Sequence, residues 1–363
     1  MVDKDLAQRQ KKRVEGLTLL FVNLRCLLNY FLVGTFLLAH ATLLVGSVNA
    51  QESKESASFF KGKTLTYIVA TKPGGGYDTY ARLLAPTFGA KLGVRKVVVK
   101  NIPGAGHLIG LKALSVADPD GLTIGTFNTG LIYAQLGGQD AMSVDLREMS
   151  WIGKASSDAR ILLLGANSGF SSIEDLRESK KPVVFGSSGV NSASFIEASL
   201  LSSVLGIDNK MVTGFAGAEA ELGILRGDLD AIVGSYSSLA PFIDAGNGKV
   251  ALAWGGEVPD DPKRFRDLGD ISHEDAGVLV LVQNLTILGR LTAAPAGLSP
   301  EILEALSQAY ADAISDPELQ QRARDIGVPL DPATGNEVQF KILETLNQPK
   351  EVIDRFLELY TDF

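Results

Sequence analysis

Residues 67–78, with the sequence YIVATKPGGGYD, constrain the fold more than any other part of the chain. The apolar first half predicts a buried strand, and the polar second half predicts the start of a helix. Gly74, Gly75 and Gly76 stand between the two and leave backbone N–H groups uncovered. The helix directs its own unpaired N–H groups and its positive dipole end into the same space. This order of elements predicts a binding site for a carboxylate or a phosphate.

A simpler interpretation is a sharp connection in which Asp78 only caps the helix. Three adjacent glycines cost more backbone entropy than such a turn requires, which favours the binding interpretation. The loop is not a nucleotide P-loop, because no Gly-Lys-Ser/Thr follows it. Lys72 precedes the glycines and is expected at the rim of the site.

The N-terminal residues have the pattern of an export signal. Three basic residues at 11–13 precede an apolar stretch from about 17 to 48, and Val48-Asn49-Ala50 suits a signal peptidase. We expect residues 1–50 to be a signal peptide and residues 51–59 a disordered lead-in. Residues 26–46 carry no Asp, Glu, Lys or Arg, so an uncleaved membrane anchor is the alternative. Both interpretations place the rest of the chain outside the cytoplasm, in the periplasm.

Charge and cysteine content exclude two classes of function. With 42 acidic and 34 basic residues the chain has a net charge of −8, which disfavours a nucleic acid partner. The only cysteine, Cys26, lies in the apolar N-terminal stretch, so the exported part has neither a disulfide nor a thiol for catalysis.

Apolar, β-branched runs alternate with helical patterns along the rest of the chain. Because strands buried on both faces read as continuous apolar runs, this alternation predicts an α/β fold with parallel sheets. The helix that starts after Ser299 has an N-cap serine followed by proline at its first position. The expected strands cover residues 65–70, 97–99, 122–127, 161–164, 183–186, 211–215, 231–233 and 250–254.

Two further glycine clusters follow strands. Residues 101–110 approach the spacing of a dinucleotide fingerprint, but no acidic residue ends a second strand about 20 positions later. We therefore expect no nicotinamide or other cofactor, and His107 is expected to start a helix. In residues 186–194, small hydroxyls and free amides are expected to hold a second polar end of a ligand.

Catalytic motifs are absent from the exported part of the sequence. A serine nucleophile in residues 186–194 would need a base, and only His107 and His273 are present, neither in a recognisable base context. Paired histidines, cysteines and an Asp-x-Asp-x-Asp-Gly loop are lacking, so no metal site is predicted. These observations favour a binding protein over an enzyme.

In their order, these motifs resemble the extracytoplasmic receptors of tripartite tricarboxylate transporters, also called the Bug family. Each motif alone is weakly specific for the family, but the occurrence of all of them in the family's order is strong evidence for the resemblance. The matching segments are PGGGYD at 73–78 with ARLL at 81–84, VVKNIPGAG at 98–106, DPDGLT at 118–123, GSSG at 186–189, LRGDLD at 225–230 and APAGLSP at 294–300.

The resemblance implies a two-lobed, type II periplasmic-binding-protein-like fold with hinge strands and an interlobe cleft. It implies lobe 1 at about 60–160 plus 285–363, lobe 2 at about 161–284, and hinge strands near 156–164 and 281–292. It also implies a receptor that holds a small organic carboxylate, mainly through loop amides, hydroxyls and water, and delivers it to membrane subunits of a transporter. We expect a monomer.

Three segments depart from the family pattern. His107-Leu108 replace a usual Gly-Asn, residues 213–217 lack a usual lysine, and a tryptophan before residue 294 is missing, with Arg290 nearby. Arg290 either supplies a charge to the ligand or takes a surface or interlobe role. The residues expected to contact the ligand are Lys72, Gly74, Gly75, Gly76 and Asp78, then Asn128 and Thr129, then Ser187, Ser188, Asn191 and Ser192, with Phe215 and Tyr236 as walls.

Two alternatives remain open from the sequence. A secreted α/β hydrolase or dehydrogenase would use the same scaffold, and its signature would be product formation from a small acid or nucleotide. A membrane-tethered subunit that senses a ligand would retain residues 1–50 as an anchor.

Overall fold

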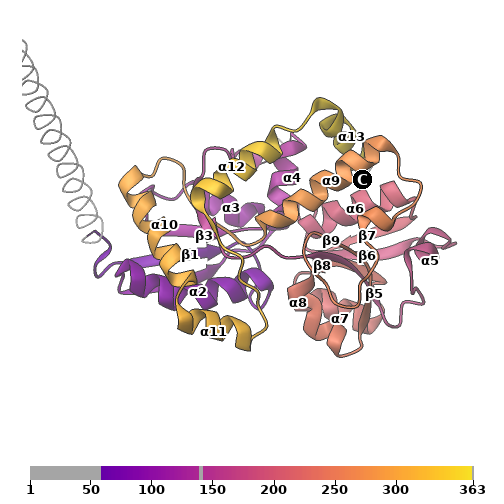
Figure 1. Cartoon of the computed structure of the whole chain (residues 1–363), viewed down its shortest axis with the longest axis horizontal. Helices are drawn as coiled ribbons and strands as arrows, with labels where there is room; N and C mark the ends of the chain where they lie inside the picture. The colour runs from indigo at the N-terminus through magenta and orange to yellow at the C-terminus, as the bar shows by residue number, and fades with distance from the viewer. Residues whose placement is uncertain (1–58, 139–141, 362–363) are drawn as a thin grey trace, which may run out of the picture. The chain divides into compact units, whose positions relative to one another are not determined.

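Two β-sheets with helices on both sides make up the part of the chain that the structure describes (Figure 1). This computed structural model describes residues 59–138 and 142–361. The predicted signal peptide and almost all of the predicted lead-in lie outside the described residues. Phe59–Phe363 is one compact unit. Among the described residues, every helix is too short or too polar to span a bilayer.

The first sheet has six strands in the order β11-β4-β10-β3-β1-β2. β1 pairs in parallel with β2 and β3, whereas β10 and β11 run antiparallel to their neighbours. The strands are β1 Thr64–Val69, β2 Lys96–Asn101, β3 Thr123–Thr126, β4 Ser150–Lys154, β10 Leu291–Ala294 and β11 Ala333–Thr334.

The second sheet has five strands in the order β7-β6-β8-β5-β9. β6 pairs in parallel with β7 and β8, and β5 runs antiparallel to β8 and β9. The strands are β5 Arg160–Gly165, β6 Val183–Ser187, β7 Asn209–Thr213, β8 Ala231–Ser235 and β9 Gly248–Trp254. All the strands expected from apolar runs are present, and the α/β class is confirmed.

Both sheets are mixed rather than purely parallel, and the crossings between them explain why. The chain passes from β4 to β5 and returns from β9 to β10. β5 and β10 each enter their sheet from the side of the other sheet. They are therefore antiparallel to their neighbours, which are joined to one another through helices.

The helices have local sequence reasons for their bounds. Ser299 accepts a hydrogen bond from the Ile302 N–H at the start of α10, as its N-cap position predicts. The helices are α2 Gly76–Leu92, α3 Leu108–Ser115, α4 Gly130–Leu136, α5 Ile173–Arg177, α6 Ala193–Leu205, α7 Ala218–Arg226, α8 Tyr236–Asp244, α9 His273–Leu285, α10 Pro300–Ile314, α11 Pro317–Asp325, α12 Gly335–Leu346 and α13 Lys350–Thr361.

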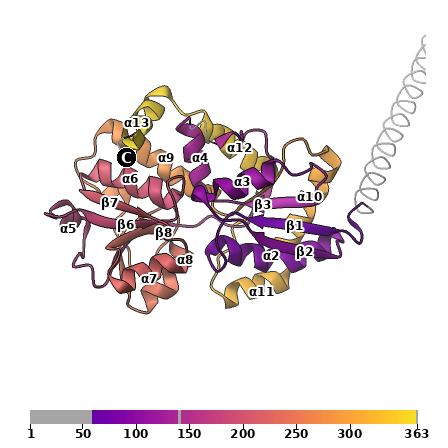
Figure 2. The same cartoon turned by 180° about the vertical axis from the view of Figure 1, so that it is seen from behind.

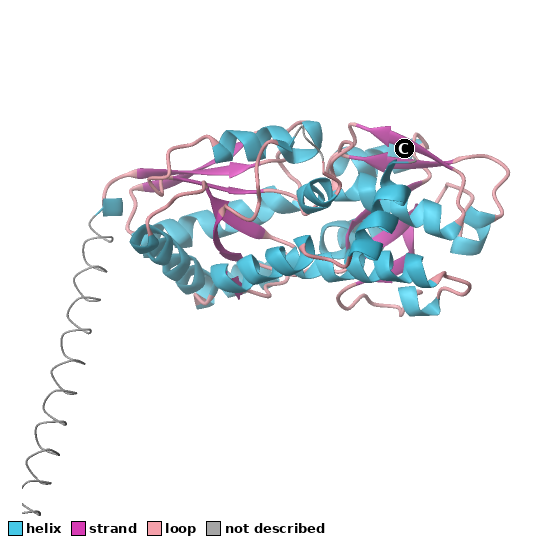
Figure 3. Ribbon diagram, turned by 90° about the horizontal axis from the view of Figure 1, so that it is seen from above, coloured by secondary structure: helices cyan, strands magenta, loops and turns pink. Residues whose placement is uncertain are grey.

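The buried apolar side chains form three hydrophobic cores. The largest contains Phe127 and Trp151 from beside the first sheet and Leu162 and Phe185 from the second, so both sheets share it. Figures 1 and 2 show α9, α12 and α13 on the side of this shared core, and the view from above in Figure 3 shows helices covering both sheets there. The other two cores belong to one sheet each, one under α2 and α10 and one under α7 and α8.

The two crossing segments are joined by backbone hydrogen bonds. The Ala155 N–H donates to the Arg290 carbonyl, and the Arg290 N–H donates to the Ser156 carbonyl, both at 2.9 Å. The expectation of a hinge strand over residues 281–292 is wrong for its first part. α9 continues to Leu285, a 3₁₀ turn covers Thr286–Leu288, and only Leu291 begins a strand. Buried positions spaced three and four apart explain the helix.

The expected lobe boundaries stay predictions, and one helix lies differently from them. Residues 350–361 fall in the range expected for lobe 1. α13 instead packs against α6 and α9, which lie in the range expected for lobe 2. Phe356 is fully buried in the shared core, which explains why the helix lies there.

Candidate functional site

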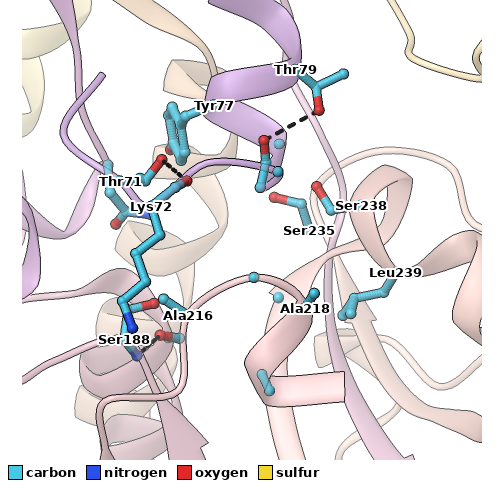
Figure 4. Close-up of a pocket in the computed structure, with 18 of the residues that line it drawn as sticks. Thr71, Lys72, Tyr77, Thr79, Ser188, Ala216, Ala218, Ser235, Ser238 and Leu239 are labelled. Carbon is cyan, nitrogen blue, oxygen red and sulfur yellow. Dashed lines mark hydrogen bonds between the residues drawn. The ribbon is translucent and has the colours of Figure 1, made fainter. Parts of the chain in front are cut away.

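A cavity of about 790 Å³ lies between the start of α2 and the starts of α7 and α8. Figure 4 shows its two sides, with Tyr77 and Thr79 from α2 facing Ser235, Ser238 and Leu239 at the end of β8 and in α8. The cavity is therefore lined from both sheets, at the ends of strands where α/β proteins commonly bind ligands.

The glycine loop between β1 and α2 forms one wall. Gly75 is the N-cap of α2 and has an extended backbone with no side-chain capping bond. The first N–H groups of α2 have no intrahelical partner, so they are available to an anion in the cavity. Gly76 has no room for a side chain, because a Cβ there would lie 2.5 Å from the Ser238 Oγ.

Asp78 holds this loop in place rather than lining the cavity. One oxygen accepts hydrogen bonds from the Gly74 N–H and the Arg82 Nε, and the other accepts one from the Asn101 Nδ2, all at 2.9 Å. Burial raises the pKa of Asp78, but these hydrogen bonds outweigh it, and the net shift is downward. The carboxylate is thus ionised and committed to the loop.

The opposite wall contains two more helix starts, and the N-cap residue of neither makes a side-chain capping bond. Gly217 is the N-cap of α7 and Ser235 the N-cap of α8, and both line the cavity. A Cβ on Gly217 would lie 3.5 Å from the Gly75 Cα, so the starts of α2 and α7 nearly touch. The starts of three helices from both sheets therefore meet at one cavity, which favours an anion there. At α8 one first-turn group is already bound, because the Ser237 N–H donates to the Asp158 Oδ1 at 3.2 Å.

Lys72 extends from the glycine loop toward Ser188 and Ala216 on the opposite wall (Figure 4). Its Nζ lies 2.7 Å from a carboxylate oxygen of Glu219 in α7. Both side chains are about half exposed, at 48% and 47%. This ion pair connects the two walls at the solvent side of the cavity.

Two arginines line the cavity at the crossing segments, of which Arg290 is buried and Arg160 is partly buried. Arg160 begins β5, donates to Glu197 at 2.8 Å through Nε, and lies 3.3 Å from the Ser235 Oγ through Nη1. Arg290 donates through Nη2 to Asp158 at 3.1 Å and to Ser238 at 3.2 Å. Each guanidinium therefore has a carboxylate partner.

Arg290 is an interlobe residue and not a surface residue. Only 4% of its side chain is exposed, and its guanidinium lies 4.7 Å from the ring centre of Tyr77 and 5.1 Å from that of Tyr80. It touches α2 through these rings and α8 through Ser238. Because it lines the cavity as well, the alternative of a direct ligand contact stays open.

His107 lines the cavity as a buried, neutral side chain. It is the N-cap of α3, as expected of a helix-start residue, and its Nδ1 lies 2.9 Å from the Ala70 carbonyl oxygen. Burial lowers the pKa of His107 to about 4. It therefore adds a polar but uncharged surface at neutral pH.

The structure brings some of the expected ligand contacts to the cavity and not others. Those that line it are Lys72, Gly74, Gly75, Gly76, Asn128, Ser188 and Phe215. Those outside its lining are Asp78, Thr129, Ser187, Asn191, Ser192 and Tyr236. The Ser192 side chain caps α6, whereas Thr129 is the buried N-cap residue of α4 without a side-chain capping bond.

Sequence reasoning missed several lining residues. The segment Ser235-Tyr236-Ser237-Ser238 follows β8 and starts α8, so the signal of small polar residues after a strand was present. Tyr236 was expected as a wall, but the serines around it line the cavity. Arg160 and Glu221 had no local signal. Within residues 59–138 and 142–361, no group of His, Cys, Asp and Glu side chains is arranged to hold a metal ion.

Two mixed α/β sheets joined by crossing segments, with a cavity lined from both, form the two-lobed α/β fold of periplasmic binding proteins. The model for the tripartite tricarboxylate transporter family receptor matches residues 80–357, and the chain belongs to this family.

Relatives of known sequence and structure are similar over most of the chain. A UPF0065 protein from the tcbD-tcbE intergenic region of Pseudomonas sp. strain P51 is 25% identical over 273 residues, covering 74% of this chain and 79% of the relative. The periplasmic binding protein BugD has a TM-score of 0.67 at 19% identity and covers 83% of this chain and 97% of its own. MatC from Rhodopseudomonas palustris with bound malate has a TM-score of 0.65 at 19% identity, covering 82% and 99%.

Proposed function

We propose that this protein captures a small organic carboxylate in the periplasm and delivers it to the membrane subunits of a tripartite transporter without converting it. The observation that carries the proposal is the meeting of the starts of α2, α7 and α8 at one cavity. Malate in the similar MatC structure supports a carboxylate as the ligand.

Backbone amides supply the binding energy in this proposal. A hydrogen bond to a charged group contributes about 1.5–3 kcal/mol, and a helix N-terminus adds roughly 0.3–2 kcal/mol. Three or four such contacts reach the roughly −8 kcal/mol of a micromolar complex only in a preformed cavity that excludes water. The loop held by Asp78 and the tightly packed Gly76 supply that preorganisation.

Opening and closing of the two walls makes the ligand's presence visible to the transporter. The crossing segments at residues 155–159 and 286–290 allow the walls to separate, and the ligand favours the closed form through contacts with both. The N-terminal segment is proposed to be a cleaved signal and the receptor a monomer. N-terminal sequencing of exported protein tests the cleavage: a start at Gln51 supports it, and a start at Met1 supports an anchor.

Thermal unfolding of the full chain with a panel of acids tests the function. Mono-, di- and tricarboxylates, aromatic acids and nucleotides would each be added at rising concentration, with the solution analysed for products. A ligand at 100 times its dissociation constant stabilises the native state by about 2.7 kcal/mol. Saturable stabilisation by an unmodified acid supports the receptor, whereas product formation or stabilisation by nucleotides alone overturns it in favour of an enzyme.

A further inference from the structure

The charges around the cavity are unusual for an anion site, because every lining lysine or arginine already has an acidic partner. An isolated cation would attract a dianion strongly, but a paired one has little charge left to offer. The three pairs are Lys72 with Glu219, Arg160 with Glu197, and Arg290 with Asp158.

One carboxylate in the lining, by contrast, has no partner. Glu221 lies in the first turn of α7 and lines the cavity, where its side chain is half-buried. Among residues 59–138 and 142–361 its carboxylate finds neither a hydrogen-bond donor nor an ion-pair partner. Burial raises the pKa of Glu221, as expected for a desolvated carboxylate without a cation beside it.

Glu221 differs in this respect from Glu219 on the same helix. A first-turn position alone favours an acidic side chain through the helix dipole, and this explanation suffices for exposed residues. The helix dipole does not explain why Glu221 lines the cavity, whereas Glu219 on the same helix is paired with Lys72. A carboxylate desolvated without a donor costs free energy, and a ligand that brings a donor offsets this cost.

We propose that Glu221 accepts a hydrogen bond from an ammonium or hydroxyl group of the ligand. It thereby selects organic acids that carry such a donor over plain di- and tricarboxylates of the same skeleton. The ligand's carboxylate lies at the start of α2, and its donor group faces α7. A second carboxylate in that position is repelled by Glu221. This inference rests on the proposed function, because it assigns a ligand class to the same cavity.

Matched acids that differ only in the donor group test the proposal. Calorimetric titration of the full chain would compare succinate, malate and aspartate, then propionate, lactate and alanine, then adipate and 2-aminoadipate. We expect the donor-bearing acid of the best-binding skeleton to bind at least about tenfold more tightly than the plain acid, the factor of one charged hydrogen bond. The hydroxyl and ammonium members show which donor is preferred.

Glu221→Gln and Glu221→Ala then assign the preference to this side chain. We expect Glu221→Gln to reduce the preference for an ammonium group about tenfold and to leave or improve binding of the plain acid. Glu304→Gln, in α10 and away from the cavity, removes the same charge and serves as the matched control. Unfolding of each variant without ligand measures any effect on α7 itself, which would weaken all ligands equally.

The outcomes separate this inference from the function on which it rests. If plain acids bind as tightly as their donor-bearing partners, or if Glu221→Gln leaves the preference unchanged, the role of Glu221 is refuted while the receptor stands. If no acid of any skeleton binds, the proposed function fails, and the assignment of Glu221 fails with it.

Discussion

Besides the shared core and the crossing segments, the two halves of the molecule meet in two regions that are built differently. In the first, which we call the junction, residues 105–107 and 128–130 pack against residues 189–193 through backbone atoms. A Cβ on Gly106 would lie 2.7 Å from the Asn191 N, and one on Gly130 would lie 2.4 Å from the Ala193 N. The Asn128 Oδ1 accepts hydrogen bonds from both the Gly130 and Ala193 N–H groups.

In the second region, which we call the mouth, the glycine loop and α2 approach α7 and α8 through side chains. Its contacts are the ion pair of Lys72 with Glu219 and the hydrogen bond of Arg290 to Ser238. Backbone packing at close distance resists separation, whereas an exposed ion pair and a single hydrogen bond break at little cost. The comparison indicates that the halves pivot about the junction and open at the mouth.

The largest expected effect tests the junction through pH. His107 has a pKa of about 4 in the folded protein, compared with 6.5 when exposed. Between these values only the unfolded state binds the proton, so stability is complete above about pH 6.5 and falls until about pH 4. The loss approaches about 3 kcal/mol. Urea unfolding across this range measures it, and His107→Gln should remove this part of the pH dependence. An unchanged profile in the variant would contradict a buried neutral histidine.

Gly130→Ala tests whether the backbone contact is rigid. The new methyl group would meet the Ala193 N and the Asn191 O within 2.4 Å, and backbone atoms do not move aside easily. We expect the free energy of unfolding to fall by about 1–3 kcal/mol. Gly75→Ala is the control at the mouth, because its Cβ would have a single neighbour, at 4.0 Å. Equal stability of the two variants would remove the distinction between the regions.

Gly76→Ala sharpens the comparison from the side of the mouth. The three atoms nearest to its Cβ would belong to the Ser238 and Arg290 side chains, which move aside more easily than backbone atoms, so the fold tolerates the methyl group. We expect stability near that of the wild type but binding of the best acid weakened about tenfold or more, because the closed form is blocked. Calorimetric titration measures this. Undiminished binding would show that closure does not bring α8 against the glycine loop.

The elements that could be predicted from the sequence are those with a local signature. The glycine loop of residues 74–76 and the apolar strands were predicted, because turn glycines and buried strands have signatures within a few residues. Residues 278–282, with the sequence VLVLV, look like a strand but form part of α9, since Val278, Leu279, Leu281 and Val282 are buried while Val280 is 58% exposed. Ser272 with acidic residues after it was the local sign of this helix start.

Of the predicted residues that line the cavity, most lie on the side of the glycine loop, and Ser188 and Phe215 lie on the opposite wall. Strand ends were expected to carry polar ligand contacts, but tertiary packing decides which of their residues face the cavity. Asn191 and Ser192 lie in the junction, whereas Ser235 and Ser238 lie at the mouth. Arg290 and Asp158 lie 132 positions apart, so no local sequence pattern predicts their ion pair.

The smallest expected effect concerns Lys72 and decides its role. As an exposed ion pair, Lys72 with Glu219 contributes about 0.2–1 kcal/mol to closure, less at high salt. Lys72→Met and Glu219→Gln should each weaken binding of the best acid by about fivefold at most, and the double variant should be no worse than either one. Calorimetric titration at low and high salt measures this cycle. If Lys72 contacts the ligand directly, as the sequence predicts, Lys72→Met alone should lower the affinity for the acid by well over tenfold. Glu219→Gln should then raise the affinity, because it releases the lysine. The sign of the Glu219→Gln effect therefore distinguishes a clasp at the mouth from a ligand contact.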